Sequence, residues 1–154
     1  TNGLIKKYCN EQICPLYKND ITMVMSDLPN GRALAKCYLI LNNNLFTLNQ
    51  RICALRIKNN TFVNIKFLYF ILNRNKQLLR FDNGVDQTNL KKEDILKTTI
   101  SIPSLTKQQA IVDILDKFDT IVNDLSNGLP AEIEARQKQY EFYRDKLLNF
   151  KRKN

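Results

Sequence analysis

Asn49, Gln50 and Arg51 stand together inside an otherwise apolar stretch of the chain. An Asn or Gln amide can both donate to and accept from the major-groove edge of adenine, and Arg can donate twice to guanine. The same side chains could instead bond local backbone groups at a bulge in a strand. These residues therefore indicate either a base-reading loop or a locally bonded bulge, and the pattern alone favours neither.

Basic side chains recur around the turns and the helix that we expect on either side of this stretch. They are Arg32, Lys36, Lys66, Arg74, Lys76 and Arg80. Cations of this kind bind phosphate oxygens, and such contacts give affinity and salt dependence without sequence specificity. Phe46, Tyr69 and Phe81 lie among them and could stack on bases, but aromatic side chains at these spacings more often belong to a core.

The positive charge is concentrated in the first two thirds of the chain. The net charge of the 154 residues is +9, and residues 1–100 carry 15 Lys and Arg against 7 Asp and Glu. The remaining residues carry 9 against 8, so they are almost neutral. A basic globular part joined to a neutral part points to a polyanionic partner such as nucleic acid, although a surface tuned for solubility can look the same.

The chain lacks the residues that most catalytic centres need. It contains no His, and its four Gly are widely separated, so His-based acid–base catalysis and a Gly-rich phosphate loop are excluded. Asp113, Asp116, Asp119 and Asp124 recur along a predicted helix, where we expect an exposed acidic face and not a metal site. We therefore predict no catalytic centre, no metal and no cofactor for the chain itself.

The four Cys are expected to be thiols and not zinc ligands. Only Cys9 and Cys14 are spaced like half of a zinc site, and no His is present to complete it. Cys37 and Cys53 stand among apolar residues, as buried thiols in a reducing cytoplasm do. Because no signal peptide and no apolar run long enough for a bilayer is visible, we predict a cytoplasmic protein outside the membrane.

The candidate residues need a scaffold of short elements, and the sequence predicts an α+β fold. Apolar runs bounded by Pro, Gly and Asn turns predict strands over residues 21–25, 37–41, 46–57 and 99–102. A helix is expected over residues 63–73 and a helical turn over residues 91–97, with mostly loop between residues 75 and 90. The basic part is thus expected to be a small mixed domain of mostly short strands.

The last third predicts two long amphipathic helices hinged at residues 128–130. Apolar residues recur at steps of three and four before the hinge and in heptads after it. Thr106 is the expected N-cap of the first helix. The pattern does not decide whether the helices continue in line or fold into a hairpin. The expected interface residues are Ile111, Leu115, Phe118, Val122, Leu125, Ile133, Tyr140, Tyr143, Leu147 and Phe150.

Two segments of this helical part resemble a known family. They are Ile102–Val112 (IPSLTKQQAIV) with Ile114–Asp119, and Asn123–Arg136 with Gln139–Leu148. Both resemble the conserved region of the specificity (S) subunit of type I restriction–modification systems. Upstream, Leu48–Arg51 and Gly84–Leu90 resemble the later half of that family's target recognition domain. The resemblance adds Gln87 to the expected DNA contacts.

The resemblance implies a DNA-reading subunit that is not an enzyme. In that family each target recognition domain reads one half of a split DNA sequence. The conserved helices space the domains and dock modification subunits, which methylate adenine using S-adenosylmethionine, while restriction subunits join for cleavage. The expected partners are therefore double-stranded DNA, modification subunits and restriction subunits. The alternative is a helical interaction module that docks modification subunits without reading DNA.

The resemblance also implies a division of the chain. Residues 1–103 are expected to be a target recognition domain whose first strands would precede Thr1. Residues 104–154 are expected to be the conserved helical spacer and dimerisation region, of coiled-coil type. A half-length subunit of this kind could pair with a second copy through its helices.

Overall fold

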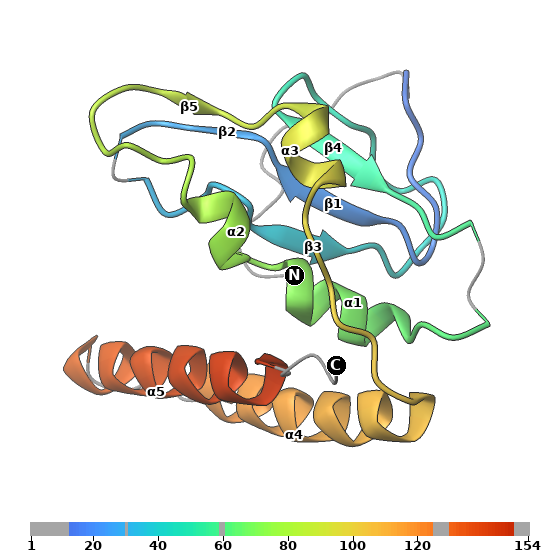
Figure 1. Cartoon of the computed structure of the whole chain (residues 1–154), viewed down its shortest axis with the longest axis vertical. Helices are drawn as coiled ribbons and strands as arrows, with labels where there is room; N and C mark the ends of the chain where they lie inside the picture. Colours follow the sequence, from blue (N-terminus) through green and yellow to red (C-terminus); the bar gives the residue numbers. More distant parts are fainter. Residues whose placement is uncertain (1–12, 30, 59–60, 125–129, 150–154) are drawn as a thin grey trace.

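The computed structural model describes residues 13–29, 31–58, 61–124 and 130–149, and of residues 121–124, 130, 131 and 133 it describes the backbone only. The centre of the basic part is a three-stranded antiparallel sheet in the order β3-β1-β4 (Figure 1). Its strands are β1 (Ile21–Val24), β3 (Cys37–Leu39) and β4 (Ile52–Leu55). The strands predicted over residues 21–25 and 37–41 are confirmed.

The sheet is held by the apolar residues of its central strand. Ile21 and Met23 are fully buried, and Met23 lies opposite Cys37 on one side and Cys53 on the other. β-branched and apolar side chains suit such a pleated, buried surface. Cys37 is buried as predicted and Cys53 is half-buried, and burial raises the pKa of both thiols.

Beyond Met25, the chain leaves the sheet as a two-stranded antiparallel ribbon. The ribbon pairs β2 (Ser26–Asp27) with β5 (Thr88–Asn89), so that Ser26 lies opposite Asn89. Figure 1 shows that it projects from one end of the sheet, on the side away from the two long helices. This pairing joins parts of the chain that are far apart in the sequence, which is why no local pattern predicted it.

Three short helices cover the sheet and the base of the ribbon: α1 (Ile65–Leu72), α2 (Lys76–Leu79) and α3 (Lys92–Leu96). α1 begins where it does because the side chain of Asn64 accepts hydrogen bonds from the backbone of Lys66 and Phe67, at 2.9 and 3.3 Å. α1 and α3 confirm the helices predicted over residues 63–73 and 91–97.

The long helices α4 (Leu105–Asp124) and α5 (Pro130–Leu148) lie side by side and run in opposite directions against α1 (Figure 1). One apolar cluster joins all three helices, and its buried members are Phe67, Phe70, Ile71, Ile111, Val112, Leu115 and Tyr140. The open choice between collinear helices and a hairpin is thus resolved as a hairpin, because the apolar faces of both helices are buried together.

Four expected features differ from the structure. The strand over residues 46–57 is confined to β4, because residues 50 and 51 form a turn before it. Residues 75–90 contain α2 and β5 and not only loop. Residues 99–102 form no strand, since the Gln77 side chain bonds both backbone groups of Thr99, at 2.8 and 3.2 Å, where a neighbouring strand would. α4 begins at Leu105, so Thr106 is not its N-cap.

The fold is α+β, as predicted, with short antiparallel strands followed by long helices. In the part of the chain that the structure describes, no helix has the length and apolarity needed to cross a membrane.

Candidate nucleic-acid interface

Backbone hydrogen bonds bring the polar loop of residues 49–51 beside the ribbon. The backbone N–H of Met25 donates to the carbonyl of Arg51 at 2.8 Å, and the N–H of Leu90 donates to the carbonyl of Met25 at 2.7 Å. The start of β4 and the end of β5 therefore meet at Met25, at the end of the sheet where the ribbon starts. The loop and the ribbon form one continuous exposed edge.

The loop has one side chain bonded to its own backbone and two more that are exposed beside it. The side-chain oxygen of Asn49 accepts a hydrogen bond from the backbone N–H of Arg51 at 2.9 Å, so it bonds locally in the turn before β4. The side chains of Gln50 and Arg51 are exposed. Asn49 therefore shapes the turn, while Gln50 and Arg51 are presented to solvent beside the ribbon.

The ribbon presents a bonded group of uncharged polar side chains. Gln87 donates through Nε2 to the hydroxyl of Ser26 at 2.9 Å and to the side-chain oxygen of Asn89 at 3.3 Å. Gln87 and Asn89 are exposed, whereas Thr88 between them is buried, as the two-residue period of a strand requires. The polar face of the ribbon therefore points to solvent and its other face points to the core.

A second group of cations surrounds the loop after β2. Arg74 has a φ of 53°, an uncommon value for a residue with a side chain, at the end of α1 where Gly often stands. Its backbone N–H donates to Ala35 at 2.8 Å, and its guanidinium donates to the carbonyl of Arg32 at 2.5 Å. Arg74 thus anchors the segment that carries the exposed Arg32 and Lys36.

The carboxylate of Asp27 points into this same loop. It accepts hydrogen bonds from the backbone of Leu28 at 2.9 Å, Ala33 at 2.6 Å and Leu34 at 3.0 Å. Gly31 lies so close to this carboxylate that a Cβ there would overlap it. The acid at the base of the ribbon is therefore a structural group that shapes the basic loop.

Arg80 lies at the end of α2, where its guanidinium stacks over the ring of Phe81 at 5.3 Å from the centroid. Phe81 itself is 39% exposed. This contact keeps the cation at the surface while its stem is covered.

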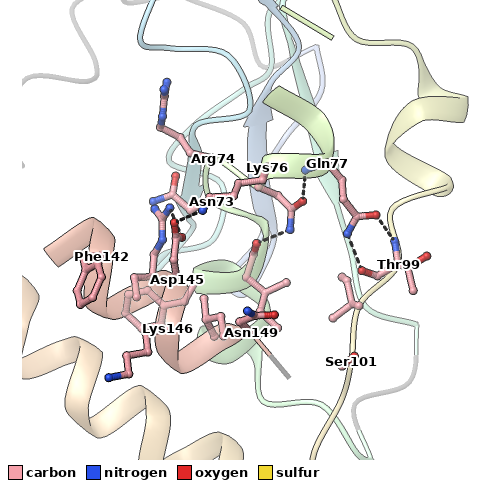
Figure 2. Close-up of a pocket in the computed structure, with 16 residues that line it drawn as sticks. Asn73, Arg74, Lys76, Gln77, Thr99, Ser101, Phe142, Asp145, Lys146 and Asn149 are labelled. Atoms are coloured by element: carbon pink, nitrogen blue, oxygen red, sulfur yellow. Dashed lines mark hydrogen bonds and ion pairs between the residues drawn. The ribbon is translucent and has the colours of Figure 1, made fainter. Parts of the chain in front are cut away.

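Lys66 and Lys76 face the helical hairpin instead. Lys66 pairs with Asp116 of α4 at 2.7 Å, and Lys76 pairs with Asp145 of α5 at 2.8 Å. Figure 2 shows Lys76 and Asp145 in the cleft of about 720 Å³ between α1, α2, residues 99–101 and the end of α5. These two predicted phosphate contacts thus lie away from the ribbon and link the basic part to the hairpin.

The Asp145 carboxylate is held ionised in this cleft. Burial opposes its ionisation, but hydrogen bonds from Lys76 and from Arg144 outweigh burial and lower the pKa of Asp145. Arg144 is buried, and its guanidinium lies 3.1 Å from Asp145. The ion pairs of the cleft therefore persist at neutral pH.

A buried glutamine fixes the start of α4. Gln108 has no solvent exposure, and its side-chain oxygen accepts from the backbone N–H of Asn64 at 2.7 Å. Its Nε2 donates to the carbonyls of Phe62 at 2.8 Å and Pro103 at 2.7 Å. Gln108 therefore ties the start of α4 to the segment that begins α1.

The predicted helix-interface residues that the structure describes mostly pack inside the chain. Ile111, Leu115 and Tyr140 are buried, Phe118 and Leu147 pack against the same cluster, and Tyr143 stacks on Phe118 with ring centroids 5.5 Å apart. The side chains of Val122, Leu125, Ile133 and Phe150 lie outside the described residues. The described seam is therefore the contact between α4 and α5 and against α1.

Sequence reasoning did not single out Ser26, Asn89 or Gln108 as site residues. Ser26 and Asn89 stand out only once β2 and β5 are paired, because in the sequence each stands beside other polar residues. Gln108 looks like any polar residue in the first turn of an amphipathic helix. Its position three residues before Ile111 and four before Val112, on the same face of the helix, is the signal that could have identified it.

The described residues hold no group of three or more Cys, Asp or Glu arranged for a metal ion. The exposed side chains around the ribbon are Arg, Lys and amide groups, which can bind a polyanion.

Comparisons with known proteins agree with this arrangement. The family model for the type I restriction modification DNA specificity domain matches residues 1–135. The chain is 41% identical over 107 residues to the type I restriction enzyme EcoR124I/EcoR124II specificity subunit of Escherichia coli, covering 68% of this chain and 26% of that protein. It is 34% identical over 108 residues to the type I restriction enzyme MpnII specificity subunit of Mycoplasma pneumoniae, covering 70% and 32%.

The fold is also similar to a solved structure. The crystal structure of the type I restriction–modification S subunit from M. genitalium superposes with a TM-score of 0.54 at 22% identity, covering 72% of this chain and 28% of that one. The chain spans about a quarter to a third of the length of these relatives. With most of its length matched by the family model, the chain belongs to the type I restriction modification DNA specificity domain family.

Proposed function

We propose that this chain is a sequence-specific DNA recognition part of a type I restriction–modification specificity subunit, and that it is not itself an enzyme. The observation that carries the proposal is the exposed edge formed by the loop of residues 49–51 and the β2–β5 ribbon, in a chain of this family with a net charge of +9. Amide and guanidinium groups on such an edge suit base edges in the major groove.

The proposed DNA contacts divide into two kinds. Arg32, Lys36, Arg74 and Arg80 would bind phosphates, because they are cations spread around the ribbon and the loop that follows β2. Gln50, Arg51 and Gln87 would face bases, because they are exposed on the edge itself. Asn49 would act mainly by shaping its turn. Lys66 and Lys76 support the proposal differently, since their ion pairs would hold the reading domain on the hairpin.

The helical hairpin would position the other subunits. We propose that residues 104–154 form the spacer and docking region for modification subunits, with restriction subunits joining the assembly, and that residues 1–103 form the reading domain. Because the described apolar seam is buried within the chain, a modification subunit or a second copy would have to bind the outward faces of α4 and α5. Phe142, with 63% of its surface exposed, is one apolar contact available there. The assembly would work in the cytoplasm.

The proposal is tested by the salt dependence of DNA binding. Fluorescence anisotropy would measure the affinity of the chain for a mixed-sequence duplex at a series of salt concentrations. Lys36→Ala removes a proposed phosphate contact near the ribbon, and Lys58→Ala removes a matched exposed lysine just beyond the opposite end of β4. Lys36→Ala should reduce the slope of log affinity against log salt by about 1, and Lys58→Ala should leave it unchanged.

Two results would overturn the proposal. The chain could show no DNA binding at low salt, or both lysine variants could lower the slope equally. A chain that bound modification subunits while retaining no DNA would establish the alternative function, a helical docking module.

A further inference from the structure

The solvent face of the β2–β5 ribbon carries polar side chains in a fixed geometry. Ser26 and Asn89 form a directly opposed pair, and Gln87 lies two residues before Asn89 on the same face. Their inward neighbours Thr88 and Leu90 are buried, which holds the register of the ribbon. A two-stranded ribbon is one of the two structures that the major groove of B-DNA admits.

The hydrogen bond from Gln87 determines how the Asn89 amide is oriented. Gln87 Nε2 donates to the side-chain oxygen of Asn89, and its other bond, to the Ser26 hydroxyl, holds Gln87 in place. An amide with this arrangement keeps its oxygen toward Gln87 and its NH₂ group on the opposite side. Its oxygen has a second lone pair, so Asn89 presents one acceptor and one donor side by side.

This acceptor–donor pair matches one base in the major groove. Adenine offers a donor at N6 and an acceptor at N7, which suit the oxygen and nitrogen of an Asn amide. Guanine offers acceptors at both O6 and N7, so its O6 would face the fixed oxygen of Asn89. Cytosine and thymine each lack one of the two groups. The orientation imposed by Gln87 therefore selects adenine.

The surroundings of the ribbon leave this face accessible to DNA. Asp27 is bonded to its own loop and Asp82 accepts from Gly84 at 2.9 Å, whereas Asp86, directly before Gln87, is exposed. Leu28 and Val85, in the loops that flank the ribbon, are 65% and 75% exposed. Large apolar side chains exposed beside polar ones are typical of a binding surface.

We infer that Asn89 is the residue that reads an adenine in the DNA target, with Gln87 as the positioning residue that sets its amide. The inference rests on the proposed function and deepens it by naming the base and the side chain. Asn89 makes the base contact through two hydrogen bonds, and Ser26 supports it by holding Gln87.

The first experiment selects bound duplexes from a randomised pool with the 154-residue chain and its variants. The wild-type chain should select a sequence that contains an invariant adenine. Asn89→Ala should relax the choice of base at that one position by about 10-fold, with the salt slope and the other selected positions unchanged. Gln87→Ala should relax the same position by a smaller factor. Asn42→Ala is the matched control, because Asn42 is exposed at the opposite end of the sheet.

The second experiment removes the matching atom from the DNA. The selected adenine is replaced by 7-deazaadenine, which lacks the N7 acceptor. This change should weaken binding by the wild-type chain several-fold and should have no further effect on Asn89→Ala. Circular dichroism of each variant checks that it is folded.

The outcomes separate the two proposals. If the wild-type chain binds DNA and selects a sequence, but Asn89→Ala selects the same bases or responds to 7-deazaadenine as the wild type does, this inference is wrong and the proposed function stands. If the wild-type chain binds no DNA, the proposed function and this inference both fail.

Discussion

Replacing Gln108 should loosen the helical hairpin from the segment that begins α1. The Gln108 side chain makes three hydrogen bonds of 2.7–2.8 Å, to Asn64, Phe62 and Pro103, and is fully buried. Each buried hydrogen bond contributes about 1 kcal/mol net, so Gln108→Ala should lower the free energy of unfolding by about 3 kcal/mol. The backbone groups of Asn64, Phe62 and Pro103 that lose the Gln108 side chain account for much of this cost.

The neighbouring glutamine is a matched control. Gln109 is exposed, and its bonds to Asn64 at 2.9 Å and Asp113 at 2.8 Å compete with water. Gln109→Ala introduces the same change of residue type in the same turn of α4. We expect it to change the free energy of unfolding by about 0.5 kcal/mol or less.

Urea unfolding followed by circular dichroism would measure both variants, and hydrogen exchange of the Asn64 amide would localise the effect. Gln108→Ala should accelerate exchange at Asn64, because that N–H donates to the Gln108 side chain. If Gln108→Ala and Gln109→Ala proved equally stable, or if exchange at Asn64 did not change, the reasoning about this buried contact would be refuted.

Two further predictions concern the basic domain. Gly31→Ala should lower the free energy of unfolding by about 1–3 kcal/mol, because its Cβ would displace the Asp27 carboxylate. Urea unfolding should find a smaller loss when the same change is made in an Asp27→Ala variant. An equal loss in both would contradict the expected overlap of the Cβ with the carboxylate. The hydrogen bond from Arg56 lowers the pKa of Asp20 below its ordinary 3.8, so this stabilisation is present above pH 3.8 and is lost as the pH falls further. In acid unfolding, Asp20→Asn should reduce the loss of stability at low pH, whereas Asp86→Asn, at an exposed carboxylate, should leave that loss unchanged. Equal curves for both variants would refute the assignment of the loss to Asp20.

The prediction of the sheet and helices succeeded where the pattern was local. The short apolar run at residues 21–25 contains β1, and Phe67, Phe70 and Ile71, which recur at helical spacing, are buried in α1. It failed where a side chain took over a backbone role. Gln77 bonds both backbone groups of Thr99 and so replaces the strand expected there, and no periodicity carries that information.

The sequence identified the candidate site residues by their chemical type, and the structure shows where each of them lies. Arg51 was singled out with Asn49 and Gln50 as a polar group in an apolar stretch, and in the structure it lies beside the ribbon. Lys66 and Lys76 have the same chemistry, yet their partners are Asp116 and Asp145 on the long helices. A cation in a sequence shows what it can bind, but the nearest anion in the fold decides what it does bind.

The sequence by itself determined the charge division, the absence of His-based chemistry, the two amphipathic helices and the family resemblance. All of these depend on composition or on short-range spacing. Only the tertiary structure decided that the helices form a hairpin on α1, that Gln108 is buried, and that Ser26, Gln87 and Asn89 share one face. The physical reason is that burial and strand pairing join residues from distant parts of the chain, whereas a sequence pattern reports only on neighbours.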